Sequence, residues 1–192
     1  EVLMAYRTVY NNLMEPIIEN STDYKVVHVS DKTKNEYGIN GYDVKISEKL
    51  NNGRFRFTNI FVVDHKDFDN LHNYAEIHDA LRDIAKSSKN KIKWKEYYKF
   101  RQLNMIMADI KQFRDGSNRL YYDIIVKDLD YAYACTGHKI QGSTYEYILV
   151  LEDDINCNPR IKERNQIKYV AISRPKKLSI VYTTKALNDE KE

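Results

Sequence analysis

Two short polar segments carry the residue types that bind phosphate groups, and each adjoins an apolar run. The first reads Thr-Gly-His-Lys-Ile-Gln-Gly-Ser at residues 136–143, ahead of the apolar run 147–151. The second reads Tyr-Val-Ala-Ile-Ser-Arg-Pro-Lys-Lys at residues 169–177, ahead of 178–182. Because α/β folds present polar and basic groups to phosphates at the ends of buried strands, this pattern indicates a protein that handles a nucleotide, a nucleic acid or both.

The first segment has the features of an anion-binding turn. Gly137 and Gly142 let the backbone approach a ligand closely, the N–H groups of a following helix start favour an anion, and Lys139 adds a point charge. A solvated turn with an incidental lysine and histidine remains an equally open interpretation of these residues taken alone.

Two arginines stand where a guanidinium group can reach a phosphate. Arg174 ends the predicted helix 158–173, beside Pro175, and Arg7 follows the predicted strand 2–6. Such an arginine can reach across an interface to a phosphate held by a neighbour, as an arginine finger does. Taken singly, each has a simpler explanation; for Arg174 it is a charge that complements the helix dipole.

Several kinds of site are not indicated. The phosphate-loop pattern Gly-x-x-x-x-Gly-Lys-Ser/Thr is absent from the sequence. An acidic run at residues 152–154 therefore favours an acidic loop over a magnesium site. The two cysteines, Cys135 and Cys157, have neither metal-site nor disulfide-framework spacing, and the histidines lack zinc-site spacing. We predict no metal site.

Composition fits a globular protein with a nucleic-acid partner but does not require one. The chain has 192 residues and a net charge of +3. No apolar run approaches the roughly 20 residues of a membrane helix, and no signal peptide is seen, so we expect a cytoplasmic protein without membrane contact. Because the first residue is a glutamate rather than a methionine and a strand is predicted from Val2 onward, we expect a segment of a longer chain.

The elements that must position these segments read α/β at both ends of the chain. Strand 2–6 and a helical pattern at 9–18 open it, and strands 130–135, 147–151 and 178–182 with helix 158–173 close it. The middle differs. Strands are predicted at 24–30, 43–46 and 54–63, with a hairpin turn at Asn51-Asn52-Gly53, followed by helices at 68–85 and 94–113.

Together the segments resemble three motifs of superfamily-one DNA helicases, in particular the RecD/Dda-like group. Residues 3–12 resemble motif IV, 136–143 resemble motif V (T-x-H-K-S-Q-G-S), and 169–177 resemble motif VI (Y-V-A-x-T/S-R-A-K-K). Ile140 replaces the serine of motif V and Pro175 the alanine of motif VI. Thr144 stands where the UvrD branch has glutamate, which favours the RecD/Dda side. The middle matches only in position, where such helicases carry an inserted β-barrel-like subdomain.

The resemblance implies the second, C-terminal RecA-like motor domain of a helicase. Its fold would be α/β, with a RecA-like parallel sheet (a P-loop NTPase-like fold without the P-loop) built from residues 1–22 and 120–192. An inserted subdomain would occupy 23–119, with a small antiparallel β unit at about 23–64 and helices at about 67–114. The missing N-terminal RecA-like domain of the same chain would be the partner lobe.

The resemblance also implies site residues for an ATP-dependent DNA helicase of bacterial or phage type, moving 5′→3′. Arg174 would supply the arginine finger to ATP and Mg²⁺ held by the missing domain, with Arg7 as second arginine and Gln141 and Gly142 beside the nucleotide. Single-stranded DNA would be gripped by Thr136, His138, Lys139, Ser143 and Thr144. Without Walker A and Walker B motifs, this segment alone would be inactive and would hold no cofactor.

Two other classes stay open. One is a helicase-derived module that binds nucleic acid or a protein without motor activity. The other is an unrelated nucleotide-binding α/β enzyme. A phosphate-loop domain in the same polypeptide would separate the helicase from both, and single-strand binding without ATP binding would exclude the enzyme.

Overall fold

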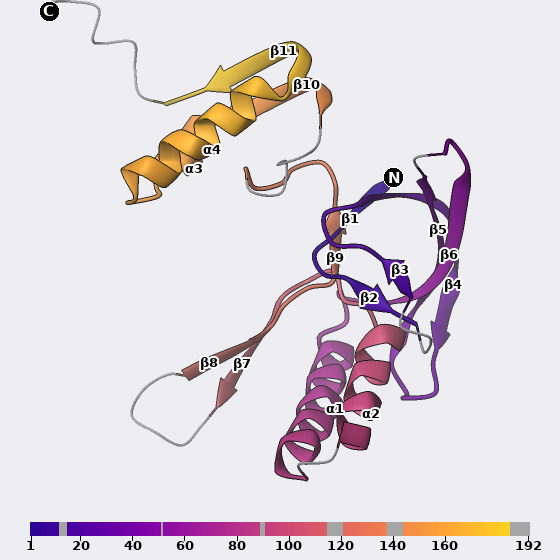
Figure 1. The fold of residues 1–192 in the computed structure, drawn as a ribbon. Helices are drawn as coiled ribbons and strands as arrows, with labels where there is room; N and C mark the ends of the chain where they lie inside the picture. Colours follow the sequence, from indigo (N-terminus) through magenta and orange to yellow (C-terminus); the bar gives the residue numbers. More distant parts are fainter. Residues whose placement is uncertain (12–14, 51, 89–90, 115–120, 138–143, 185–192) are drawn as a thin grey trace, which may run out of the picture. The chain divides into compact units, whose positions relative to one another are not determined.

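The computed structural model describes residues 1–11, 15–50, 52–88, 91–114, 121–137 and 144–184, which form two compact units (Figure 1). The first unit comprises residues 1–133 and the second residues 134–192. Each unit is described by itself.

A five-stranded antiparallel sheet forms the first unit's framework. Its strands, in spatial order, are β6 (Phe55–Val63), β5 (Asn40–Lys49), β4 (Asp23–Lys34), β1 (Val2–Ala5) and β9 (Leu129–Tyr131). The predicted hairpin turn joins β5 to β6, where Gly53 has a φ of +79° that a residue with a side chain rarely adopts. The Gly53 N–H donates to the Leu50 carbonyl at 2.9 Å and closes the turn.

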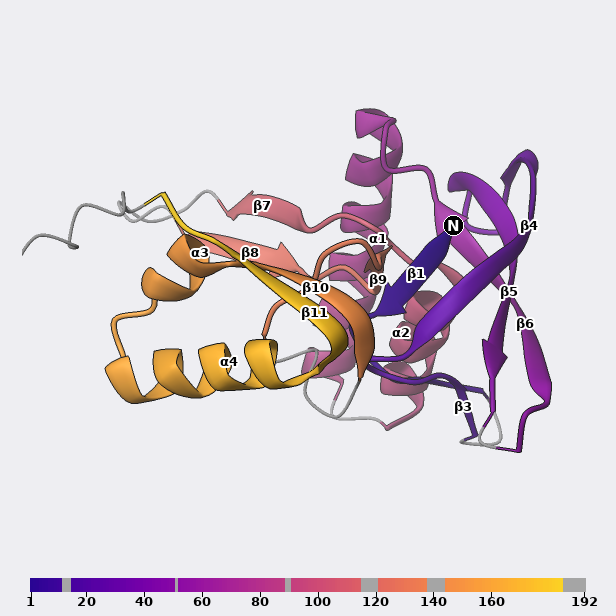
Figure 2. The ribbon, with the colours of Figure 1, turned by 90° about the horizontal axis from the view of Figure 1, so that it is seen from above.

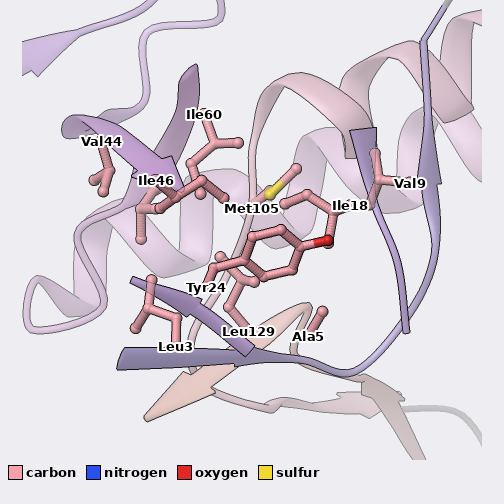
Figure 3. Packing of buried hydrophobic residues seen from close by; sticks show 11 residues of the cluster. Leu3, Ala5, Val9, Ile18, Tyr24, Val44, Ile46, Ile60, Met105 and Leu129 are labelled. Atoms are coloured by element: carbon pink, nitrogen blue, oxygen red, sulfur yellow. The ribbon is translucent and has the colours of Figure 1, made fainter. Parts of the chain in front are cut away.

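One face of this sheet carries the first of two hydrophobic cores (Figure 3). Alternation along each strand turns every second side chain inward, so Val44 and Ile46 of β5 meet Ile60 of β6 in the interior. Tyr24 of β4 is fully buried among them, and its hydroxyl accepts a hydrogen bond from the Glu19 N–H at 2.8 Å. Burial raises the pKa of Tyr24 to about 12, which keeps this hydroxyl protonated.

The second core lies between the sheet and two helices, α1 (Phe68–Ser87) and α2 (Lys91–Leu103). Asp67 caps α1 by accepting from the Asn70 N–H at 3.1 Å. Tyr74 of α1 and Phe100 of α2 meet in this core, with ring centroids 5.1 Å apart. Two short antiparallel pairs complete the first unit: β2 (Val9–Tyr10) with β3 (Pro16–Ile18), and β7 (Ile110–Arg114) with β8 (Tyr121–Ile125).

The second unit is a strand–helix–strand unit with parallel strands. β10 (Tyr145–Leu151) is followed by α3 (Glu152–Asn156), α4 (Ile161–Ser173) and β11 (Pro175–Tyr182), and α4 runs along the strand pair (Figure 2). Val150 of β10 and Ala171 of α4 form its small core. The opposite face of the strands carries exposed apolar side chains, namely Tyr147, Leu149, Leu151, Leu178, Ile180 and Tyr182.

The predicted RecA-like parallel-sheet fold is wrong. The largest sheet is antiparallel throughout, and the only described parallel strand pairing between named strands is β10 with β11. Strand β1, which the prediction placed in the parallel sheet, pairs antiparallel with β4 and β9. A short apolar run such as Val-Leu-Met-Ala predicts a buried strand but does not reveal the direction of its neighbours. The boundaries predicted for an inserted subdomain, 23–119, stay a prediction.

Two predicted helices also need correction. The described part of segment 9–18 forms β2 and β3, because Pro16 lacks the N–H that a helix interior needs. The helix predicted at 94–113 ends at Leu103, since Met105 forms a bridge to Val62 of β6 and Ile110 begins β7. The helix predicted at 68–85 is confirmed as α1, and α4 begins three residues later than predicted, at Ile161 rather than Asn158.

Candidate functional site

The second polar segment lies beside the residues that directly follow the first, at one edge of the parallel strand pair. Because β10 and β11 run in the same direction, their first residues lie side by side, with Tyr145 opposite Pro175. The Tyr145 N–H donates to the Arg174 carbonyl oxygen at 3.3 Å. Thr144 and Arg174, which directly precede the two strands, are therefore neighbours. We call this region, Thr144 to Tyr145 and Arg174 to Pro175, the strand-start edge.

Arg174 at the strand-start edge has an unsatisfied donor. Its backbone caps the C-terminus of α4 with helical dihedral angles, and its side chain is partly buried. The Nε atom is buried and makes no hydrogen bond to the described residues. An unpaired buried donor costs about 1–3 kcal/mol, so an acceptor brought to this nitrogen, such as a phosphate oxygen, would offset that cost. The charge also complements the carboxyl end of the α4 dipole.

The polar segment that begins at Thr136 is fixed to α4 at its first glycine. Cys135 packs against the core of the second unit, and Thr136 is exposed. A Cβ atom added at Gly137 would lie 2.3 Å from the Ile167 Cγ2 atom of α4, which excludes any larger residue without rearrangement. Gly137 thus serves close packing on the helix, and it lines a hollow of about 670 Å³ together with Gln166 and Tyr169.

The remaining predicted residues of this segment divide into two groups. Thr144 is exposed at the start of β10. His138, Lys139, Gln141, Gly142 and Ser143 lie outside the described residues. The strand-start edge therefore brings together Thr144 and Arg174, and the described part of the first polar segment, Thr136 and Gly137, lies against α4.

Arg7 lies in the first unit, in a buried polar network. Its Nε atom donates to an Asp128 carboxylate oxygen, and its Nη2 atom donates to the Arg101 carbonyl at 2.8 Å. Asp128, only 1% exposed, also accepts from Arg101 Nη2 at 2.6 Å and from the Ile106 N–H at 2.9 Å. This bonding ties the start of the chain to α2 and β9. A role for Arg7 as a second nucleotide-contacting arginine stays a prediction.

The network holds its charges by pairing them. Burial alone would lower the pKa of Arg101, but the negative charge of Asp128 together with the interactions of Tyr74 and Tyr97 outweighs this effect, and the net shift is upward. Arg101 also donates to the Tyr74 hydroxyl at 3.0 Å, and burial raises the pKa of that tyrosine. Sequence reasoning missed this network; its one available signal was a charged residue, Asp128, beside the apolar run Ile-Ile-Val at 124–126.

The acidic run 152–154 forms the first turn of α3 and makes bonds within its own unit. Glu152 pairs with Lys168 of α4 at 2.6 Å, and Asp153 accepts from the Thr184 N–H at 2.7 Å. The prediction of a loop is therefore corrected to a short helix. In the described part of the chain, no three side chains of His, Cys, Asp or Glu gather as a metal site would require.

Comparison with known proteins does not assign the chain to a family. No protein-family model matches the chain, and no curated protein matches it. Among the described helices, none has the length and apolar character needed to cross a membrane.

Proposed function

We propose that this chain is the C-terminal part of an ATP-dependent DNA helicase or translocase of superfamily one. The observation that carries the proposal is the hydrogen bond between the Tyr145 N–H and the Arg174 carbonyl, which joins the segment resembling motif VI to the strand that begins two residues after the segment resembling motif V. A motor that couples nucleotide hydrolysis to strand movement needs its nucleotide contact and its strand contact to share one rigid element. The β10–β11 pair is such an element.

In this proposal Arg174 contacts a nucleotide held by another domain that carries a phosphate loop. ATP with Mg²⁺ supplies the phosphoryl group, and the guanidinium group neutralises charge that develops on it. The unsatisfied Arg174 Nε supports this role, because a phosphate oxygen would satisfy it. Gln141 and Gly142 would lie beside the nucleotide. The chain by itself contains no phosphate loop, so the proposal assigns hydrolysis only to the longer protein.

Single-stranded DNA would run along the other side of the same segment. Thr136 and Thr144 offer exposed hydroxyl groups at its two ends, and His138, Lys139 and Ser143 would complete the phosphate contacts. Backbone contacts of this kind grip the strand without reading its sequence. A cytoplasmic location, as for other proteins that act on DNA in bacteria or phage-infected cells, belongs to the same proposal.

The test is Arg174→Ala in the polypeptide that includes the phosphate-loop domain. DNA-stimulated ATP hydrolysis should fall by about 10³-fold or more while ATP binding stays near normal. The matched control is Arg160→Ala at the other end of α4, an arginine that is 83% exposed and pairs only weakly with Glu163, at 3.7 Å. Equal hydrolysis rates for the two variants would remove Arg174 from this role.

The second candidate function is a helicase-derived module that binds nucleic acid or a protein without motor activity. The observation that favours it is the bonding of Arg7, whose guanidinium group is already committed to Asp128 and Arg101. Under this alternative the chain binds single strands, but Arg174→Ala changes no hydrolysis rate in any longer form of the protein.

A further inference from the structure

The outer face of strands β4, β5 and β6 combines exposed aromatic rings with lysines. Val44, Ile46 and Ile60 turn into the core, so the residues between them turn outward. Phe55 and Phe57 of the edge strand β6 are 59% and 57% exposed. We call the surface formed by Lys25, His28, Lys45, Lys49, Phe55 and Phe57 the outer sheet face; all six residues are exposed.

Strand register places the lysines around the rings. Lys49 lies opposite Phe55, and Lys25 lies two strands away from Phe57, with Ser47 between them. The Lys45 ammonium group is 5.2 Å from the centroid of the Phe57 ring, a cation–π contact that fixes both side chains on the same face.

One carboxylate lies on this face: Asp23 of β4 is exposed and stands two residues before Lys25. Glu48 turns to the opposite face, where it pairs with Arg56. Asp43 lies further along β5, opposite Phe61. Three lysines, Lys25, Lys45 and Lys49, therefore outnumber the carboxylates near Phe55 and Phe57.

We propose that the outer sheet face binds single-stranded nucleic acid. A single strand offers both groups that this surface needs: base faces for the two rings and phosphates for the lysines. An apolar protein surface would cover the rings but would strip water from the lysines without giving them a partner. Exposed aromatic side chains on a sheet that stack two or three bases are a known way of binding single strands.

The spacing of the rings suits two consecutive bases. Phe55 and Phe57 are two residues apart on one strand, so their Cα atoms are separated by about 7 Å along it. With two bases stacked on the rings, the phosphate backbone of the nucleic acid would run past Lys49 and Lys45. The face therefore provides two stacking positions in a row with a cation beside each.

This surface goes beyond the proposed function because it belongs to the first unit and uses none of residues 136–144 or Arg174. Its binding needs neither a nucleotide nor a phosphate-loop domain. The test is therefore made on the chain as it stands, and its failure leaves the proposed function untouched.

The decisive measurement is fluorescence anisotropy of a labelled thymidine oligonucleotide titrated with the full chain. Phe55→Ala and Phe57→Ala should each weaken binding by roughly 5-fold to 100-fold, the loss expected for one stacked base. The control is Phe68→Ala, since Phe68 is 84% exposed at the start of α1, outside this face. Thermal melts of all three variants should match the parent, because the rings are exposed.

Two further readouts separate stacking from charge. Changing Lys45 and Lys49 together to alanine should reduce the slope of log affinity against log salt concentration by about 1.4, because each of the two lost phosphate contacts contributes about 0.7. The control Lys86→Ala on α1 should leave the slope unchanged. A bromodeoxyuridine oligonucleotide crosslinked by light should mark the tryptic peptide 57–66.

Three results would overturn the proposal. The first is that Phe55→Ala and Phe57→Ala bind the oligonucleotide with the same affinity as Phe68→Ala. The second is that polyglutamate displaces the labelled oligonucleotide as effectively as unlabelled oligonucleotide does, and the third is that the chain binds duplex DNA with the same affinity as the single strand. The second result would indicate an acidic protein partner instead.

Lys139→Ala serves to separate this proposal from the proposed function. If the losses in binding free energy caused by Lys139→Ala and by Phe57→Ala add in the double variant, the two residues make independent contacts with the oligonucleotide.

Discussion

Replacing Asp128 with alanine should be among the most destabilising single changes in the first unit. The carboxylate is shared by Arg7 and Arg101 and also accepts from the Ile106 N–H. The Arg101 side chain is only 8% exposed, so the variant leaves its charge buried without an anion. Removing one partner of a buried ion pair costs about 3–5 kcal/mol. Domains are stable by only about 5–15 kcal/mol, so this loss is a large share.

Urea unfolding followed by tryptophan fluorescence measures this loss, because the fluorescence reports on the first unit, where Asp128 lies. The chain has one tryptophan, Trp94, which lies on α2 with its ring 5.7 Å from that of Tyr97. The control is Asp130→Ala, two residues away, whose carboxylate pairs with Lys127 nearer the surface and should contribute no more than about 1 kcal/mol. The reasoning is refuted if Asp128→Ala and Asp130→Ala lower the free energy of unfolding by the same amount.

Two further changes test the packing and the titration. Gly137→Ala should destabilise the second unit by about 1–3 kcal/mol, because the new methyl group meets Ile167; thermal unfolding by circular dichroism should show partial recovery in the double variant Gly137→Ala with Ile167→Ala. Burial lowers the pKa of His78 below its ordinary value of 6.5, and Asp79 only partly opposes the shift. The unfolded state therefore binds the proton more readily, so stability is full above pH 6.5 and decreases as the pH falls below it. His78→Asn should remove this decrease in urea unfolding at pH 5.5 against 7.5, and His72→Asn, an exposed histidine, should keep it.

Local patterns predicted the elements whose cause is local. The alternation in residues 54–63 and the Asn51-Asn52-Gly53 signal predicted β6 and its hairpin, since a positive φ at Gly53 is a requirement of the turn itself. The apolar spacing from Phe68 to Ala85 predicted α1 for the same reason. In the second unit, the strands predicted at 147–151 and 178–182 are present and begin a few residues earlier.

Long-range pairing could not be read from the sequence. The helical spacing at 9–18 counted Val9 and Ile18 on one face, yet these residues pair across β2 and β3 and are buried in the sheet's core. The 94–113 pattern continued past Leu103 because Met107 and Ile110 fit helical spacing, but Met105 bonds to the backbone of Phe61 and Val63. Arg7 shows the same limit at the site, since its partner Asp128 lies 121 residues away along the chain.

The uncovered side of the β10–β11 pair sets a practical condition on handling this protein. Parallel sheets in proteins are covered on both faces, yet within the second unit α4 covers only one, and Leu149 and Ile180 stand opposite each other on the other. A recombinant fragment of residues 134–192 has this apolar face exposed to solvent. We therefore expect the fragment to precipitate or to form mixed oligomers.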